Sequence, residues 1–374
     1  MKNFTISQVP SHLIPSDPRF GCGPSLIPTQ NIQRLSEFSP HLLGTSHRKK
    51  PVINLMISVE NELRSFFQLP SDYAIVIGNG GATMLFDMLG LGLIKEKALH
   101  HTCGEFSNKW MKASQRIPGL TVLEKKAAPG EGLEIDGDLA ASCDFVASTL
   151  NETSTGVKLS GVSDFSSHEK TLLLMDATSG AAAIEVDVSK VDAFFFSVQK
   201  VFASEGGTHV LFLSPKAQKR IEEIKDSRYI PASFYLPDYL ASSEKHQNFN
   251  TPSLTSLLLL EMQLKEMNKL GSAEVFQLAK KKAALLYGWA EEKEYLTPFV
   301  KEAKYRSEAV ATINMDEKID AQKLVAFLEE NKLVYGIDAY RKLGQNQLRI
   351  SLFHNIAYDD LERLTKLVSH LVES

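Results

Sequence analysis

Short hydrophobic segments alternate with helical stretches from about residue 72 to residue 215. Each segment is rich in Val, Ile, Phe or Leu and is too short for a helix: residues 74–78, 144–149, 171–176, 192–197 and 208–213. Continuous apolar strands of this kind are buried on both faces, and their alternation with helices is typical of a parallel sheet. The pattern predicts an α/β fold whose mostly parallel sheet is covered by helices.

The pattern changes after about residue 250. Residues 253–270 and 273–292 have helical spacing with little Gly or Pro, which predicts two long helices. The remainder predicts a strand, a helix, two strands and a terminal helix, at residues 308–315, 320–330, 332–337, 347–353 and from Tyr358 onward. We therefore expect an N-terminal segment (1–20), a large domain (21–262) and a smaller α+β domain (263–374), with the ligand site between the domains.

Composition and charge exclude several classes of function. The chain has 374 residues and a formal net charge of −4. Its longest apolar runs fall far short of the ~20 residues that span a bilayer. It lacks the long basic stripe that nucleic-acid binding requires. The N-terminus has no apolar core of a secretory signal, so we expect a cytoplasmic protein with neither membrane nor nucleic-acid partners.

Three cysteines are scattered along the chain: Cys22, Cys103 and Cys143. Their odd number is unlike a disulfide framework, and they lack the paired spacing of a zinc site. We expect free thiols and no metal site.

A glycine-rich turn follows the first predicted strand, at residues 77–83, and opens a helix. Such a turn presents free N–H groups and a positive dipole end to an anion. It is not a Walker loop, and Thr83 stands where a dinucleotide fingerprint has its third glycine. The turn alone fits a phosphate site and a purely structural role equally well.

Two ionisable residues end successive predicted strands. Asp176 lies where open α/β sheets bind ligands, although a helix cap is the commoner role of such an aspartate. Lys200 follows the next strand, where partial desolvation would lower its pKa toward the neutral amine of Schiff-base chemistry. Alone, Lys200 would be interpreted as a surface lysine. The order of turn, carboxylate and lysine is that of fold-type I pyridoxal-phosphate (PLP) enzymes.

The sequence resembles the phosphoserine aminotransferases, a class-V family of fold-type I PLP enzymes. The resemblance extends from Phe20 to the C-terminal helix and is greatest to the branch with a Tyr-Arg-Lys-Leu-Gly segment, here residues 340–344. The matching motifs are Gly44-Thr-Ser-His47-Arg48, Gly80-Gly81-Ala82-Thr83, Asn151-Glu152-Thr153, Asp176-Ala-Thr178-Ser179, Gln199-Lys200 and Asn250-Thr251-Pro252.

The resemblance implies roles around the cofactor ring. Lys200 would form the Schiff base and then move the substrate's proton, and Asp176 would keep the pyridine nitrogen protonated. Phe106 would stack on the ring, where other branches carry tryptophan. Thr153 would donate a hydrogen bond to the phenolic oxygen.

The cofactor phosphate and the subunit arrangement follow from the same resemblance. The expected phosphate ligands are Ala82, Thr83, Gln199, Asn250 and Thr251. In the family, the counterparts of Asn250 and Thr251 reach into the neighbouring subunit, which predicts a homodimer with shared sites. Without the resemblance, Asn-Thr-Pro is a turn before a helix.

Several cations are needed for substrates that carry two anionic groups. Arg349 resembles the arginine that binds the α-carboxylate. His47 and Arg48 would receive the distal phosphate or carboxylate, together with Arg341. Arg341 lies farther from Arg349 than in the commoner branch, so Lys342 is an alternative. Taken alone, the basic residues 47–50 would be a solvated face.

The implied reaction is ping-pong transfer of an amino group from L-glutamate to 3-phosphohydroxypyruvate, which gives O-phospho-L-serine for serine biosynthesis. The family also acts on a phosphohydroxythreonine analogue in pyridoxine biosynthesis, and the sequence leaves that activity open. Rival interpretations are an alanine– or serine–glyoxylate aminotransferase, a cysteine desulfurase, and a non-catalytic relative. Intact Lys200, Asp176 and Arg349 argue against the last.

Overall fold

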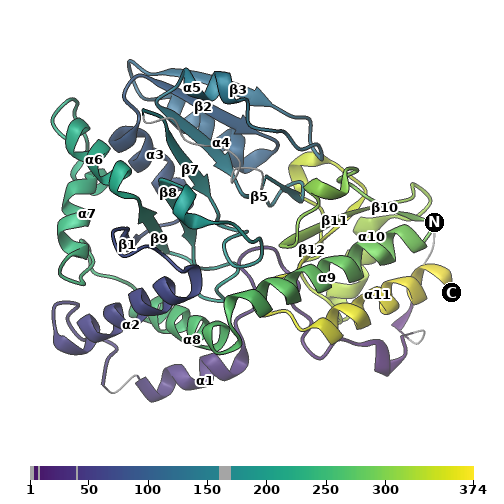
Figure 1. Ribbon diagram of the computed structural model, residues 1–374. Coiled ribbons are helices and arrows are strands. Elements are labelled where there is room, and N and C mark those ends of the chain that lie inside the picture. The colour runs from purple at the N-terminus through teal and green to yellow at the C-terminus, as the bar shows by residue number, and fades with distance from the viewer. Residues whose placement is uncertain (1–3, 7–8, 39–40, 160–169) are drawn as a thin grey trace.

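A seven-stranded sheet forms the centre of the molecule. The computed structural model describes residues 4–6, 9–38, 41–159 and 170–374. The strand order is β1-β9-β8-β7-β4-β2-β3. The strands are β1 (Ala74–Asn79), β2 (Lys97–Thr102), β3 (Thr121–Lys126), β4 (Phe145–Thr149), β7 (Leu172–Asp176), β8 (Ala193–Ser197) and β9 (Thr208–Leu213). All neighbours are parallel except β9, which is antiparallel to both β1 and β8. The predicted α/β fold is confirmed (Figure 1).

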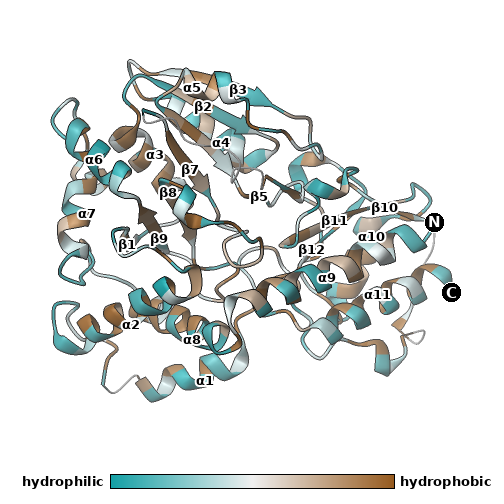
Figure 2. Cartoon of the chain, viewed as in Figure 1, coloured by the Kyte–Doolittle hydropathy of each residue, from teal (hydrophilic) through white to brown (hydrophobic). Residues whose placement is uncertain are grey.

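Both faces of this sheet are buried under helices. One face packs on α3 (Ala82–Leu93), α4 (Glu105–Gln115), α6 (Pro215–Ile224) and α7 (Leu236–Ser243). The other packs on α2 (Lys50–Phe67) and α8 (Leu254–Leu270), and α1 (Thr29–Phe38) lies against α8. In β8, Phe195 belongs to the first core, and Phe194 and Phe196 belong to the second. Burial of both faces explains why the central strands β7 and β8 consist almost entirely of apolar residues (Figure 2).

The C-terminal part is a smaller α+β unit around an antiparallel sheet, β10-β11-β12. Its elements are α9 (Ser272–Glu292), β10 (Leu296–Pro298), β11 (Val310–Met315), α10 (Ala321–Glu330), β12 (Gln347–Ser351) and α11 (Tyr358–Glu373). The predicted helices and two of the predicted strands are confirmed. The division between domains at residues 262 and 263 stays a prediction, and it falls within the continuous helix α8.

The predicted strand at residues 332–337 is wrong. Tyr335 makes one isolated bridge, to Arg19, through hydrogen bonds between Phe20 N and Tyr335 O and between Tyr335 N and Pro18 O. Positive φ angles at Lys332 (57°) and Gly336 (77°) flank this bridge and break the extended conformation on both sides. A ladder therefore cannot form, although the composition suits a strand.

A short hairpin joins the two parts of the molecule. It consists of β5 (Asn151–Glu152), β6 (Val157–Lys158) and the intervening turn. The Thr312 hydroxyl of β11 donates to Thr155 O (2.8 Å), and Lys158 forms an ion pair with Glu308. Gly156 has a φ of +71°, and a Cβ there would lie 2.6 Å from Thr312 Oγ1. The hairpin is thus fixed to the C-terminal unit at several points.

The remaining elements are short. They are α5 (Gly137–Ala141), η2 (Ser11–Leu13), η4 (Val188–Lys190), η5 (Ala232–Phe234), η6 (Ala303–Tyr305) and η7 (Arg341–Leu343). Within the described parts of the chain, none of the helices is both long enough and apolar enough to cross a bilayer. The three cysteines are buried and unpaired, which confirms the predicted free thiols.

Candidate active site

A cavity of about 150 Å³ lies at the carboxyl ends of β4, β7 and β8. Ligands bind at this edge in open α/β sheets because the loops that follow the strands converge there. The cavity lining includes most of the predicted cofactor residues: Ala82, Thr83, Phe106, Thr153, Asp176, Gln199 and Lys200. Residues separated by more than a hundred positions in sequence therefore meet in one site.

Lys200 presents its amine to this cavity from the turn after β8. Its side chain is 9% exposed, and Nζ donates a hydrogen bond to Thr153 Oγ1 at 3.1 Å. Nζ also lies 5.0 Å from the centre of the Phe106 ring. Burial lowers the pKa of Lys200, and the carboxylate of Asp176 partly opposes this shift. The site therefore favours a larger neutral fraction of the amine than water does, as a nucleophilic lysine requires.

The stem of Lys200 needs a glycine beside it. Gly23 has a φ of +139°, and a Cβ at this position would lie 2.7 Å from Lys200 Cε. The loop that contains Gly23 is held to the lysine's own turn, since Ser25 N donates to Gln199 O at 2.9 Å. The loop therefore packs directly against the stem of Lys200.

Asp176 is the last residue of β7 and is buried. Its Oδ1 accepts a hydrogen bond from Thr178 N at 2.9 Å. Burial raises the pKa of Asp176, while the hydrogen bonds from Thr178 and the charge of Lys200 oppose this rise. A cation bound against this carboxylate would offset the cost of its burial, so the residue suits a protonated ring nitrogen.

A chain of hydroxyl groups orients Lys200. The amine donates to Thr153 Oγ1, which lies 2.7 Å from Ser179 Oγ, and Ser179 in turn donates to Asn151 O at 3.1 Å. Asn151 Nδ2 also donates to Ser179 Oγ at 2.7 Å. Of the residues in this hydrogen-bonded series, the sequence analysis gave a role to Thr153 only. Asn151 and Ser179 lie in the motifs that it quoted but received no role.

Within the predicted glycine-rich segment 77–83, residues 80–83 are the glycine turn, which forms one end of the cavity. Gly80 has a φ of +98°, Gly81 is the N-cap of α3 without a side-chain cap, and Ala82 N donates to Ser197 Oγ at 2.7 Å. Several polar atoms of the lining, among them Gln199 Oε1, Asn151 Oδ1 and Thr149 Oγ1, are buried without a partner among the described residues. Unsatisfied groups beside a helix N-terminus are expected where a polar ligand binds.

Arg349 lies beside this site, on β12. Its Nη1 lies 3.5 Å from Thr153 O, and its buried Nε has no hydrogen-bond partner among the described residues. Its guanidinium carbon lies 5.5 Å from the centre of the Tyr340 ring, whose centre is 6.0 Å from that of Phe106. Tyr340, which the sequence analysis did not single out, thus contacts both the predicted stacking ring and the predicted carboxylate-binding arginine.

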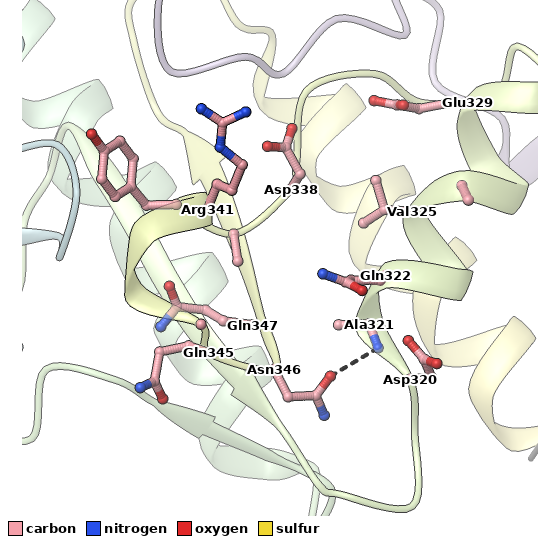
Figure 3. A pocket seen from close by; sticks show the side chains of 14 residues that line it. Asp320, Ala321, Gln322, Val325, Glu329, Asp338, Arg341, Gln345, Asn346 and Gln347 are labelled. Atoms are coloured by element: carbon pink, nitrogen blue, oxygen red, sulfur yellow. Dashed lines mark hydrogen bonds between the residues drawn. The ribbon is translucent and has the colours of Figure 1, made fainter.

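Arg341 and Lys342 point to different places. Lys342 forms an ion pair with Glu105, the residue before Phe106. Arg341 lines a separate groove of about 560 Å³ between α10 and residues 338–347. Figure 3 shows Arg341 near Asp338 at the edge of this groove. In this structure Lys342, and not Arg341, is tied to the helix that holds Phe106.

Besides Arg349 and Arg341, four predicted site residues do not line the cavity: His47, Arg48, Asn250 and Thr251. Arg48 lies on an exposed turn before α2, and His47 is half-buried. Asn250 and Thr251 are exposed, and Thr251 O accepts a hydrogen bond from Asn79 Nδ2 at 2.6 Å, next to the glycine turn. A single chain therefore brings the ring-binding residues together without these four.

Comparison with known proteins gives matches over nearly the whole chain. The family model for class-V aminotransferases matches residues 20–364. The phosphoserine aminotransferase of Rhodococcus jostii is 41% identical over 367 residues, 97% of each chain. The structure of a phosphoserine aminotransferase from Cytophaga hutchinsonii is similar with a TM-score of 0.84 at 23% identity, over 94% of this chain and 97% of that one. A PLP-bound phosphoserine aminotransferase from Trichomonas vaginalis is similar with a TM-score of 0.80 at 20% identity, over 94% and 99% of the two chains.

Proposed function

This chain belongs to the class-V aminotransferase family, and on that premise we propose that it is a phosphoserine aminotransferase. It transfers an amino group between L-glutamate and 3-phosphohydroxypyruvate and gives 2-oxoglutarate and O-phospho-L-serine, in serine biosynthesis. The relative from Rhodococcus jostii supports this substrate assignment. The observation that carries the chemistry is the buried Lys200 amine, which shares one cavity with Asp176.

The enzyme is a PLP-dependent transaminase. When bound, PLP supplies an aldehyde that accepts the amino group and a ring that withdraws electrons from the substrate Cα. The cavity fits this cofactor: Lys200 would bond to the aldehyde carbon, Asp176 would pair with the ring nitrogen, and Thr153 would bond the phenolic oxygen. Phe106 would cover the ring. Ala82, Thr83 and Gln199, which line the end of the cavity at the N-terminus of α3, would bind the phosphate.

Lys200 carries the proton as well as the cofactor. Once an incoming amino acid has taken its place, the free amine of Lys200 would accept the proton that leaves the substrate Cα and would donate it to the carbon that carried the aldehyde. Nζ of Lys200 donates to Thr153 Oγ1 at 3.1 Å, and burial lowers the pKa of the amine, which favours its role as a base. The same residue therefore serves as nucleophile, base and acid.

The two anionic ends of the substrate require two cationic regions. Arg349 has an unpartnered Nε and lies against Thr153 O, so it would bind the α-carboxylate next to the reacting carbon. The distal phosphate or carboxylate would be bound by His47 and Arg48. Because these two residues do not line the cavity of their own chain, we place them in the site of a second subunit, with Asn250 and Thr251. The functional unit is then a homodimer with shared sites.

Lys342 is the better candidate for the additional cation, although Arg341 was the first choice from the sequence. Lys342 already reaches Glu105 at the start of α4, whereas Arg341 lines the groove beside Asp338. A substrate phosphate near Phe106 would compete with Glu105 for the ammonium group. Lys342→Ala should then raise the KM for phosphoserine more than Arg341→Ala does.

The proposed function is tested by an assay that couples glutamate and 3-phosphohydroxypyruvate to 2-oxoglutarate formation. Arg48→Ala should lower kcat/KM for the phosphorylated substrate by about a hundredfold, the loss of charge-assisted hydrogen bonds to an oxyanion. Lys50→Ala, which removes the same charge two residues away, is the control. Unchanged turnover in Arg48→Ala would remove this residue from the proposed phosphate site, and absence of turnover in the unmodified enzyme would refute the proposed reaction.

Mixing two inactive variants tests the shared site. If Arg48 serves the neighbouring subunit, a heterodimer of Lys200→Ala and Arg48→Ala contains one site in which both residues are intact. Random reassociation of equal amounts then restores about a quarter of the activity of the unmodified enzyme. If Arg48 acts within its own chain, the mixture stays inactive.

Rival and additional activities use the same assay with other substrates. A glyoxylate aminotransferase would prefer glyoxylate over the phosphorylated acid. A desulfurase needs an accessible cysteine, and Cys22, Cys103 and Cys143 are all buried, so this rival is not favoured. We also propose activity on the phosphohydroxythreonine analogue of pyridoxine biosynthesis, measured as a second substrate, and a cytoplasmic location, tested by fractionation.

A further inference from the structure

Glu152 is a buried carboxylate behind the cavity, and the proposed mechanism does not use it. It lies on β5 between Asn151 and Thr153, both of which line the cavity. Because successive side chains of a strand point to opposite sides, Glu152 points away from the cavity and toward the N-terminus of α4. Its side chain is 0% exposed.

Both carboxylate oxygens are occupied by donors. Oε2 accepts from Ser107 N at 2.9 Å and Ser107 Oγ at 2.8 Å, and Phe106 N lies 3.1 Å from Oε2 and 3.2 Å from Oε1. Oε1 also accepts from Ser154 Oγ at 2.6 Å. A buried charge is tolerated only when such donors surround it, and a helix N-terminus adds a favourable dipole. The set of donors therefore fixes α4 relative to β5.

The fit around Glu152 leaves no spare room. Gly104, the N-cap of α4, would place a Cβ 2.4 Å from Glu152 Cγ and 2.6 Å from Ser154 Oγ. The carboxylate thus occupies the space that a side chain at position 104 would need. This packing holds the first turn of α4 directly against β5.

The residue whose backbone N–H is held in this way is Phe106 itself. Its ring lies 5.0 Å from Lys200 Nζ and 6.0 Å from the Tyr340 ring. The backbone N–H of Phe106 donates to Glu152, and Thr153, the first residue of the turn after β5, accepts a hydrogen bond from the lysine amine. Two neighbouring residues, Glu152 and Thr153, therefore hold the Phe106 ring and the Lys200 amine of the cofactor site.

We propose that Glu152 is a positioning residue that sets the height and tilt of the Phe106 ring over the cofactor. The inference rests on the proposed function, because the stacking role of Phe106 belongs to it. A weaker hold on α4 would let the ring move off the cofactor plane and lower the affinity for PLP. Glu152 acts through Phe106 and does not contact the cofactor.

The test measures cofactor binding in the intact protein. Glu152→Gln keeps the shape of the side chain but loses the charge that the N–H donors bind, and Gly104→Ala displaces the carboxylate from the opposite side. Both variants should bind PLP about tenfold more weakly, the effect of one lost charge-assisted hydrogen bond. Both should also reduce the visible circular-dichroism band of the bound cofactor, which reports the asymmetry of its surroundings.

A control and a double variant separate positioning from general stability. Asp136→Ala removes the N-cap of α5, whose carboxylate accepts from Leu139 N at 3.0 Å in the same domain, and should lower the melting temperature without changing PLP affinity. In a Phe106→Leu background, Glu152→Gln should cause no further loss of PLP affinity, because the ring through which it acts is gone. If the two losses add, or if Glu152→Gln retains the unmodified affinity and dichroism, the inference is wrong. Failure of the unmodified protein to bind PLP would instead refute the proposed function.

Discussion

Replacing Arg349 by lysine should slow the reaction of every amino-acid substrate by a similar factor. In the structure, few N–H groups of this guanidinium are hydrogen-bonded to the protein. Nη1 is 3.5 Å from Thr153 O, and the buried Nε has no partner among the described residues. The open donors form a fork that matches a carboxylate. An ammonium group keeps the charge but offers a single point of contact.

The expected loss follows from two contacts. One charge-assisted hydrogen bond contributes about 1.5–3 kcal/mol. The guanidinium also lies 5.5 Å from the centre of the Tyr340 ring, and a cation–π contact of this kind contributes about 0.5–1 kcal/mol. A total of roughly 2–4 kcal/mol corresponds to a 30- to 1,000-fold decrease in kcat/KM.

The assay follows each half-reaction separately, by the absorbance of the bound cofactor after rapid mixing with glutamate, phosphoserine or alanine. All three substrates carry the α-carboxylate, so Arg349→Lys should slow all three by a similar factor. Arg48→Ala, in contrast, should leave the slow reaction of alanine unchanged, because alanine has no distal anion. A loss confined to phosphoserine in Arg349→Lys, or one smaller than about threefold, would refute the assignment.

Three further predictions concern other residues. Borohydride should attach the cofactor to residue 200 in the unmodified enzyme and not in Lys200→Ala, and mass spectrometry of the digested protein detects the label; a label elsewhere would contradict the assignment. Asp176→Asn, which leaves the ring nitrogen without its anionic partner, should slow both half-reactions about a hundredfold, since removal of one partner of a buried pair costs about 3 kcal/mol or more; a decrease below tenfold would count against the pairing. Burial lowers the pKa of Lys282, whose Nζ donates to Phe353 O, to about 7. From about pH 7 to pH 10 the unfolded chain therefore keeps a proton that the folded chain has released. The free energy of unfolding then rises by up to about 1.4 kcal/mol per pH unit. Lys282→Met should remove this rise when denaturant unfolding is compared at pH 7 and pH 9, and equal slopes in the two proteins would disprove it.

The central strands were predictable because they are apolar on both faces, but β2 and β3 were not. His100 and His101 of β2 are buried, and burial lowers their pKa values to about 3 and about 4, so both side chains are neutral in the core. Histidine nevertheless looks polar in a sequence. β3 is one of the two edge strands and mixes charged residues with half-buried apolar ones. Neither strand has the continuous apolar run by which the others were recognised.

Site residues were predictable from the sequence where they directly follow a strand, because the carboxyl ends of the strands form the ligand-binding edge of the sheet. Asp176, Lys200 and Ala82 are of this kind, and the structure brings them to one cavity. Glu152 is different, because its partners at Phe106 and Ser107 are more than forty positions away. Tyr340 likewise acquires its place only when the C-terminal unit packs on the large one. Long-range packing, which sequence patterns do not encode locally, supplies these residues.

The hairpin of β5 and β6 supports the Lys200 amine independently of the outer segment at residues 341–345. It is fixed to Thr312 of β11 and to Glu308, which precedes β11, and it carries Thr153, which accepts a hydrogen bond from the Lys200 amine. Residues 341–345, by contrast, are largely exposed and are joined to the large domain through Lys342. Substitutions in residues 341–345 should therefore disturb the contact between Thr153 and Lys200 less than substitutions in the hairpin. If Lys342 binds the substrate as proposed, the contacts that set substrate preference and those that hold the reacting amine lie in separate segments of the chain.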